Sequence, residues 1–174
     1  MAVQVKRPRT AEEIILTFLE SQLKEGETWE DYTFRATEKR LYGYPIAKAR
    51  VENFREKIKE IEEGGLPGRS NIPRIDQVLA QKGSRLDPEE IKETILTFTS
   101  AQMQIDEREI REIDIALRLI NGSHYTDIIR YKYFEEKSDE QIADLICCDD
   151  STVRRNKNIL VRRIALFLYG SAAI

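Results

Sequence analysis

A cluster of basic and hydrogen-bonding side chains lies toward the C-terminal end of the chain, within residues 151–163. This stretch holds five bases and no acid: Arg154, Arg155, Lys157, Arg162 and Arg163. Arginine can pair with the edge of guanine through two hydrogen bonds, asparagine can do the same with adenine, and both can reach phosphate oxygens. The pattern therefore indicates DNA recognition, provided that the surrounding elements hold these side chains on one exposed face.

A helical-wheel count separates two faces of this segment, because an ideal helix turns by about 100° per residue. Leu160, Ile164 and Phe167 fall on the same side as Val153, and we expect that side to be buried. The opposite side carries polar and basic residues, and the first turn of the helix offers free backbone donors to phosphate. The predicted DNA-binding residues are Ser151, Thr152, Arg154, Arg155, Asn158 and Arg162.

The segment before this helix has the spacing of a helix-turn-helix. Ser138 can cap a helix over residues 139–146. Where the two helices cross, the first must offer a small residue, and Ala143 is that residue. The chain then turns at Cys147, a position usually taken by glycine. Val153, ten residues after Ala143, fills the core between the helices. The predicted core of this motif is Ile142, Ala143, Ile146, Cys147, Val153 and Leu160. A basic helix alone is more often a solvated amphipathic helix, and the correctly spaced preceding helix is what favours DNA binding.

The rest of the chain predicts an all-α fold of four regions. These are an N-terminal helical region (1–63), a linker rich in glycine, proline and basic residues (64–86), a long helix or coiled-coil-like helix pair (87–121), and the helix-turn-helix domain (122–174). In the first region, residues 10–25 form an amphipathic pattern. Thr28 opens a second helix toward residue 42, and Pro45 fits the first turn of a third that runs to about residue 63.

Residues 88–120 carry apolar side chains at spacings of three and four, the pattern of a coiled coil. These positions are 91, 95, 98 and 105, then 110, 113, 117 and 120, with a change of phase near Asp106. Either one long helix changes face there or two helices meet. Together with Ile159 and Leu166, which lie away from the buried side of the C-terminal helix, this run predicts a homo-oligomer.

Composition excludes several classes of function. The 174 residues have a net charge of −3, one histidine and two cysteines, and the cysteines are adjacent. Such a set offers no zinc site and no spaced disulfide, and acid pairs such as Glu62/Glu63 are explained by solubility rather than catalysis. With no apolar run of membrane-spanning length, we expect a cytoplasmic protein that is not an enzyme and has no cofactor.

The motif region resembles a known family. Residues 131–143, which read YKYFEEKSDEQIA, followed by DSTVRR at 150–155, are similar to the fourth region of bacterial sigma factors. They resemble more closely the ArpU/RinA-type phage transcriptional regulators, as do TEKRLYGYP at 37–45 and FLYG at 167–170. The resemblance implies a phage or prophage regulator that activates a late operon in the host bacterial cell. It also implies that Ser151, Thr152, Arg154, Arg155 and Asn158 read bases.

Two other functions fit the same residues. Small phage terminase subunits, which package DNA, also combine a helix-turn-helix with assembly through helices, and a ring-shaped oligomer would distinguish them. Alternatively, the basic helix docks on an acidic protein such as RNA polymerase. In that case any binding to DNA would be absent or insensitive to salt.

Overall fold

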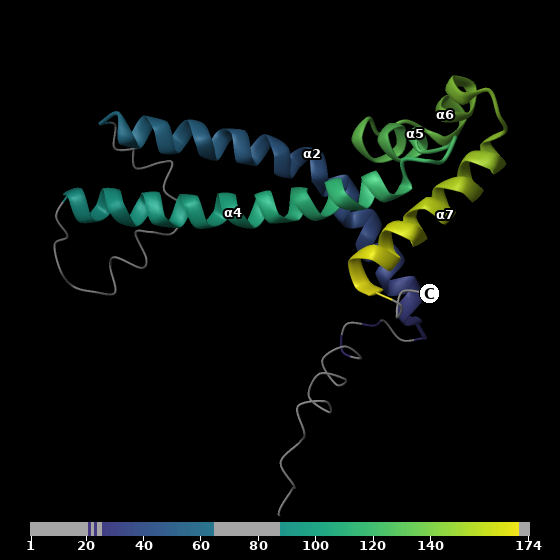
Figure 1. The fold of residues 1–174 in the computed structure, drawn as a ribbon, viewed down its shortest axis with the longest axis horizontal. Helices are drawn as coiled ribbons and strands as arrows, with labels where there is room; N and C mark the ends of the chain where they lie inside the picture. Colours follow the sequence, from purple (N-terminus) through teal and green to yellow (C-terminus); the bar gives the residue numbers. More distant parts are fainter. Residues whose placement is uncertain (1–20, 22, 24–25, 65–87, 171–174) are drawn as a thin grey trace, which may run out of the picture.

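The described residues are mostly helical. The structure is a computed structural model that describes residues 21, 23, 26–64 and 88–170, and within them no strand occurs, as the all-α prediction requires. The elements are α2 (Trp29–Glu62), α4 (Pro88–Ile120), α5 (Asp127–Ile129), the π-helical segment η2 (Arg130–Phe134), α6 (Asp139–Ile146) and α7 (Asp150–Tyr169) (Figure 1). Nearly all of the helix predicted over residues 10–25 and nearly all of the linker at 64–86 lie outside the described residues.

Helix α2 begins where the sequence predicts and continues where a break is expected. Thr28 and Asp31 form a capping box: the Asp31 N–H donates to Thr28 Oγ1 over 3.1 Å, and the carboxylate of Asp31 accepts from the Thr28 N–H over 3.4 Å. The prediction of two helices separated before Pro45 is wrong, because Pro45 lies inside one helix of 34 residues. Proline removes one backbone hydrogen bond and bends a helix rather than always ending it. Figure 1 shows such a bend between the purple and teal parts of α2.

Helix α4 runs alongside α2 in the opposite direction (Figure 1). It is a single helix of 33 residues, so the first of the two predicted arrangements is the correct one. Ile95, Ile113 and Ile120 of its coiled-coil pattern are buried. Phe98 and Ile105, counted in the same pattern, are exposed. The pattern therefore contains two faces, of which α2 covers one.

Charged side chains hold the two long helices in register. The guanidinium of Arg40 makes two hydrogen bonds to the carboxylate of Glu109, of 2.6 and 2.8 Å, and a third of 2.6 Å to Glu112. Further along the pair, Arg55 lies 2.9 Å from Glu107. Such two-pronged arginine–carboxylate contacts fix orientation as well as distance.

Helix α7 packs across α2 and the C-terminal end of α4, and one hydrophobic core joins these three helices to α5 and η2. Its buried members are Leu41, Tyr44, Ile113, Ala116, Ile120, Ile129, Tyr133, Leu160, Val161 and Ile164. The C-terminal half of α7 is thereby fixed to the long helices, while its first turns extend beyond them to α6 (Figure 1). Within the described residues, every helix is too short or too polar to cross a lipid bilayer.

Candidate nucleic-acid interface

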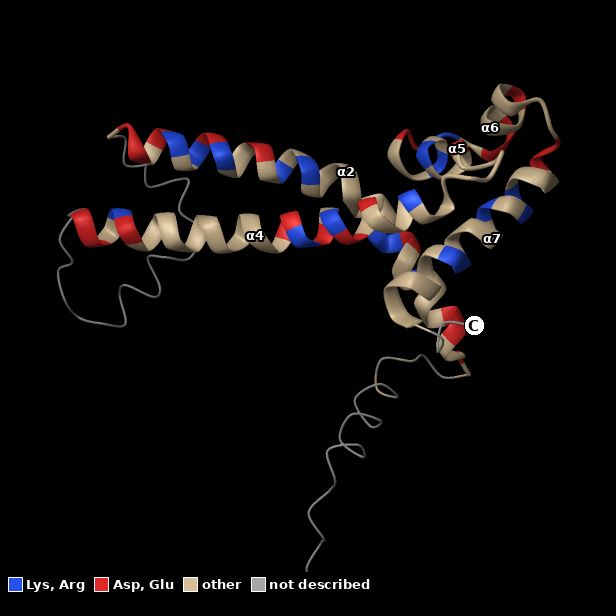
Figure 2. Ribbon diagram, viewed as in Figure 1, with Lys and Arg blue, Asp and Glu red and all other residues tan. Residues whose placement is uncertain are grey.

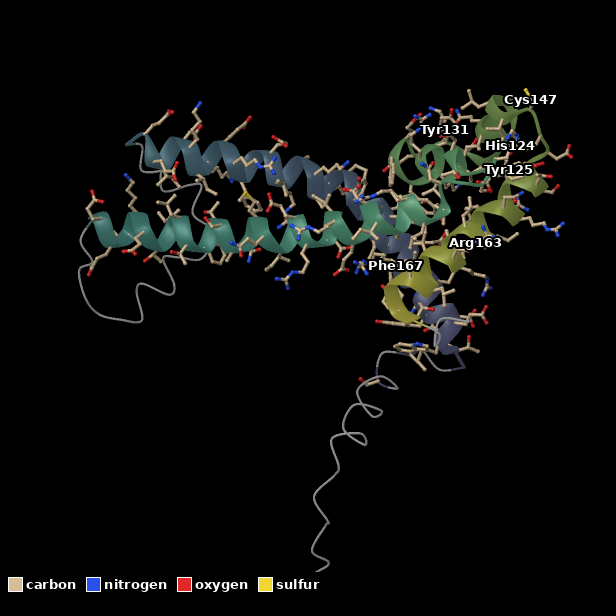
Figure 3. All side chains as sticks on the ribbon, viewed as in Figure 1. His124, Tyr125, Tyr131, Cys147, Arg163 and Phe167 are labelled. Atoms are coloured by element: carbon tan, nitrogen blue, oxygen red, sulfur yellow. The ribbon has the colours of Figure 1, made fainter. Side chains whose placement is uncertain are left out.

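The junction between α6 and α7 has the turn that the sequence predicts. Ser138 caps α6: its hydroxyl accepts from the Gln141 N–H over 3.2 Å, and the Gln141 side chain accepts from the Ser138 N–H over 2.9 Å. Only residues 147–149 separate the two helices. Cys147 has φ 53° and ψ 53°, the left-handed conformation that glycine usually takes at a helix end. Figure 3 shows Cys147 at the tip of this junction.

A small hydrophobic cluster lies beneath the junction. It consists of Ile142 and Ala143 from α6, Val153 from α7 and Ile128 from α5, with Ile146 packed at its edge. Ala143 and Val153 are thus part of one cluster, as the ten-residue spacing predicts. Ile128 of α5, which is not part of the predicted core, is the fourth side chain of the cluster.

The prediction for Leu160 needs correction. Leu160 is buried, but it packs in the large core with α2 and α4 and not in the cluster beneath the junction. Phe167, predicted on the buried side, is 42% exposed, and Val161 and Ala165 are buried instead. The wheel count assumes one neighbour for the whole helix. In fact α7 meets α5 and α6 over its first turns and the long helices over the rest, so its buried face rotates along its length.

Five of the six predicted DNA-binding residues are exposed on α7: Ser151, Arg154, Arg155, Asn158 and Arg162. The side chain of Arg155 makes no ion pair or hydrogen bond with any other described residue. Arg154 lies 3.7 Å from the carboxylate of Asp139, and its side chain remains 62% exposed. Thr152 is half-buried, and its carbonyl accepts a hydrogen bond of 2.9 Å from Asn156 within the helix. Arg155 is therefore the cation of this face most available to a ligand.

Arg162 lies on the exposed side of α7 but is engaged by the first turns of α2. It forms an ion pair with Glu30, and its guanidinium carbon lies 5.6 Å from the centre of the Phe34 ring. Lys157 is similarly engaged, with its ammonium 3.4 Å from Glu38. Two of the five bases thus have acidic partners on α2, a contact across more than a hundred residues that no local pattern indicates.

Acids border the same face. Asp149 and Asp150 are exposed at the start of α7, and Asp139 lies in the first turn of α6 (Figure 2). Burial opposes the ionisation of Asp139, but the hydrogen bond and charge of Lys132, 2.6 Å away, outweigh it, so the pKa of this carboxyl is lowered. Asp139 is consequently anionic at neutral pH and restrains Arg154. The basic face is narrow and centres on Arg155 and Asn158.

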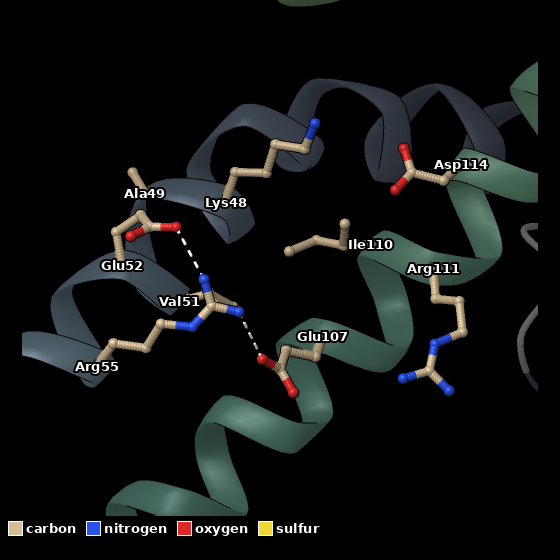
Figure 4. A pocket seen from close by; sticks show the side chains of 9 residues that line it. All are labelled: Lys48, Ala49, Val51, Glu52, Arg55, Glu107, Ile110, Arg111 and Asp114. Atoms are coloured by element: carbon tan, nitrogen blue, oxygen red, sulfur yellow. Dashed lines mark hydrogen bonds and ion pairs between the residues drawn. The ribbon is translucent and has the colours of Figure 1, made fainter. Parts of the chain in front are cut away.

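A groove of about 720 Å³ lies between α2 and α4, away from this face (Figure 4). Its charged lining contains three bases and three acids: Lys48, Arg55, Arg111, Glu52, Glu107 and Asp114. Arg55 pairs with Glu52 over 3.0 Å and with Glu107 over 2.9 Å. Because its charges largely neutralise one another, the groove presents no concentrated charge to a ligand. The described residues also contain no group of His, Cys, Asp or Glu side chains that could hold a metal ion.

Compared with known proteins, the chain matches no family model, no curated protein and no solved structure.

Proposed function

We propose that the protein is a transcriptional regulator that binds duplex DNA through α7, in the manner of a helix-turn-helix. The observation that carries the proposal is the exposed position of Arg155 next to Asn158, on a helix whose opposite side is held by Val153. A rigid helix that presents these donors has the chemistry needed to read guanine and adenine in the major groove.

The net charge of −3 is compatible with this proposal, since binding to DNA depends on the local field rather than on the total. The acids at residues 149 and 150 are expected to keep phosphates away from the extreme start of α7. Base contacts by Arg155 and Asn158, with phosphate contacts by Ser151 and Arg154, suit the exposures along the helix. The role in activating a phage late operon rests on the sequence resemblance alone.

The test is to select bound duplexes from a random pool and to measure the affinity of the enriched sequence by fluorescence anisotropy. Arg155→Ala should cost about 1–3 kcal/mol on that sequence if Arg155 reads a base. Arg163→Ala is the matched control, because Arg163 is an exposed arginine of the same helix outside the proposed face. Equal affinity of wild type and Arg155→Ala, or no enrichment at all, would contradict the proposal.

The packaging alternative is supported by one observation, the exposed apolar side chains of α4, since such subunits must assemble. A ring of several subunits in solution would favour it. A regulator that reads a two-part operator needs only a dimer.

A further inference from the structure

Helix α4 presents a second apolar stripe that no described residue covers. Phe98, Ile105, Ile115 and Leu119 are 47, 59, 37 and 65% exposed, respectively. They lie on a different side of the helix from Ile95, Ile113 and Ile120, which face the core shared with α2. Several large aliphatic side chains along one side of a helix usually mark a site where another chain packs.

The stripe has the spacing of a coiled-coil seam. Its positions are 98, 101, 105, 108, 112, 115 and 119, in alternating steps of three and four residues. Alternating steps of this kind keep side chains on one face and let them insert between those of a facing helix. The occupant should therefore be a helix that runs nearly parallel or antiparallel to α4.

Six of the seven stripe positions are symmetric about position 110; the exception is Phe98, whose equivalent, residue 122, lies beyond the end of α4. Three pairs of positions lie at equal distances from residue 110: 105 and 115, 101 and 119, and 108 and 112. The two isoleucines thus occupy equivalent places, and a base, Arg108, occupies the place equivalent to an acid, Glu112. A helix with this arrangement is complementary to its own reversed copy.

We propose that the protein forms a two-fold dimer in which α4 packs antiparallel against α4 of a second copy, with the axis near residue 110. Ile105 then meets Ile115 of the other copy, and Arg108 meets its Glu112 in two equivalent charge pairs. Arg108 is exposed and has no ion pair with another described residue, so it is available for this contact. Glu112 is held by Arg40 at 2.6 Å and keeps a side chain that is 47% exposed.

A parallel pair is disfavoured by the same charges. It would place Arg108 against Arg108 and Glu112 against Glu112, and like charges facing each other in a coiled coil are unfavourable. One contact opposes the antiparallel pair as well: Arg111, at the border of the stripe, approaches its own copy near the axis. Arg111→Ala should therefore tighten the dimer, whereas Arg108→Ala should weaken it.

The first test is sedimentation equilibrium of the full chain. The wild type should be a dimer at micromolar concentration, and Ile105→Glu should weaken it by about a hundredfold or more, because each dimer would bury two unpaired charges. Ile46→Glu is the matched control, because Ile46 is 63% exposed on α2 and lies outside the stripe. Monomeric wild type, a ring, or an equal effect of both substitutions would overturn the proposal.

Charge reversal tests the central layer. Arg108→Glu should weaken the dimer, and adding Glu112→Arg in the same chain should restore it. Because Glu112→Arg replaces the acid that lies 2.6 Å from Arg40, Glu112→Arg alone is the control, and its melting temperature reports whether the contact between α2 and α4 is retained. If the double variant is no better than Arg108→Glu alone, the proposed pairing is wrong.

Disulfide formation tests the direction. In a background with Cys147→Gly and Cys148→Ala, a chain that carries both Ile105→Cys and Ile115→Cys should form covalent dimers under oxidation. A chain with either cysteine alone should not, because residue 105 lies about 15 Å along the axis from its own copy. Covalent dimers from the single variants would indicate a parallel pair.

A dimer that appears only after removal of residues 1–25 would mean that this segment, and not a second copy, occupies the stripe.

Discussion

The hydroxyl of Tyr133 donates a hydrogen bond of 2.6 Å to Oε1 of Glu38, 95 residues earlier in the chain. Lys157 lies 3.4 Å from the same oxygen. One carboxylate on α2 thus contacts both η2 and α7. The position of the proposed DNA-binding helix is consequently tied to the long helices by a polar contact as well as by the hydrophobic core.

This contact predicts how stability depends on alkaline pH. Burial, and then the hydrogen bond to Glu38, raise the pKa of Tyr133 far above its usual value. A group with a raised pKa in the folded state contributes stability that is complete below its unfolded pKa, about 10 for tyrosine, and is lost as the pH rises above it. Urea titrations at a series of pH values should therefore show the free energy of unfolding falling as the pH rises above about 10.

Substitution separates this contribution from those of other tyrosines. Tyr133→Phe should lower the free energy of unfolding at neutral pH by about 1.5–3 kcal/mol, the usual effect of losing a hydrogen bond to a charged group, and should flatten the alkaline decline. Tyr42→Phe is the matched control, since Tyr42 is exposed and packs edge-on against Tyr133. The same alkaline decline in Tyr133→Phe as in the wild type would contradict this account.

The turn at Cys147 predicts a stabilising substitution. A left-handed conformation is unfavourable for residues with a Cβ and not for glycine. Cys147→Gly should therefore raise the free energy of unfolding by about 1 kcal/mol, or the melting temperature by about 2–4 °C. Cys147→Ala keeps the unfavourable backbone and should give no such gain. Thermal melts of the three proteins in reducing buffer provide the measurement, and a gain with alanine would contradict the backbone explanation.

Local chemistry explains which parts of the structure the sequence could predict. The correctly predicted features depend on residues within a few positions of one another. They are the capping boxes at Thr28 and Ser138, the turn at Cys147 and the all-α class. The break at Pro45 was predicted from the same local rules and is wrong. Leu41, one turn before the proline, and Tyr44, directly before it, are buried in the core, and this packing offsets the lost backbone hydrogen bond.

The partly wrong predictions for α7 have a different origin. Which cations remain available on the outward face depends on distant residues of α2, because Glu30 engages Arg162 and Glu38 engages Lys157. A helical wheel gives the direction of a side chain but not its neighbours. The same limit explains Leu160, which has the predicted burial and a different set of contacts.

Acid should weaken the junction between η2 and α6 through Asp139. Because its pKa is lowered in the folded protein, this carboxylate contributes stability that is present above the ordinary aspartate pKa, about 4, and is lost as the pH falls below it. Asp139→Asn should lower the free energy of unfolding by about 1 kcal/mol at neutral pH and should have a smaller effect at pH of about 3. Asp144→Asn, on the exposed side of the same helix, is the control and should be nearly neutral at both values. Equal effects of the two substitutions would contradict the role of the Lys132 contact.

Release of Arg162 should increase general affinity for DNA, provided that α7 is the DNA-binding helix. Glu30→Gln removes the acid that engages Arg162 and leaves an additional cation beside the proposed face. Binding to all duplexes should tighten, and the slope of log affinity against log salt should steepen by about one unit. Glu56→Gln removes the same charge from an exposed site farther along α2 and serves as the control. An equal gain from both would attribute the effect to net charge alone.

The proposed dimer and the proposed DNA-binding helix together predict the layout of the operator. In an antiparallel pair centred at residue 110, the C-terminal ends of the two α4 helices at residue 120 lie about 30 Å apart along the axis. Each end leads into its own α5, α6 and α7, and the first turns of α7 extend beyond it (Figure 1), so the two DNA-binding faces lie more than 30 Å apart. Two major grooves on one side of B-DNA are about 34 Å apart. Selected duplexes should therefore contain an inverted repeat whose half-sites are centred a whole number of helical turns apart, and insertion of half a turn (about five base pairs) between them should abolish the gain from the second half-site. The Ile105→Glu variant should bind a duplex with one half-site as tightly as a duplex with two. Enrichment of a single asymmetric site by a dimeric protein would contradict this layout while leaving the contacts of each α7 with DNA in place.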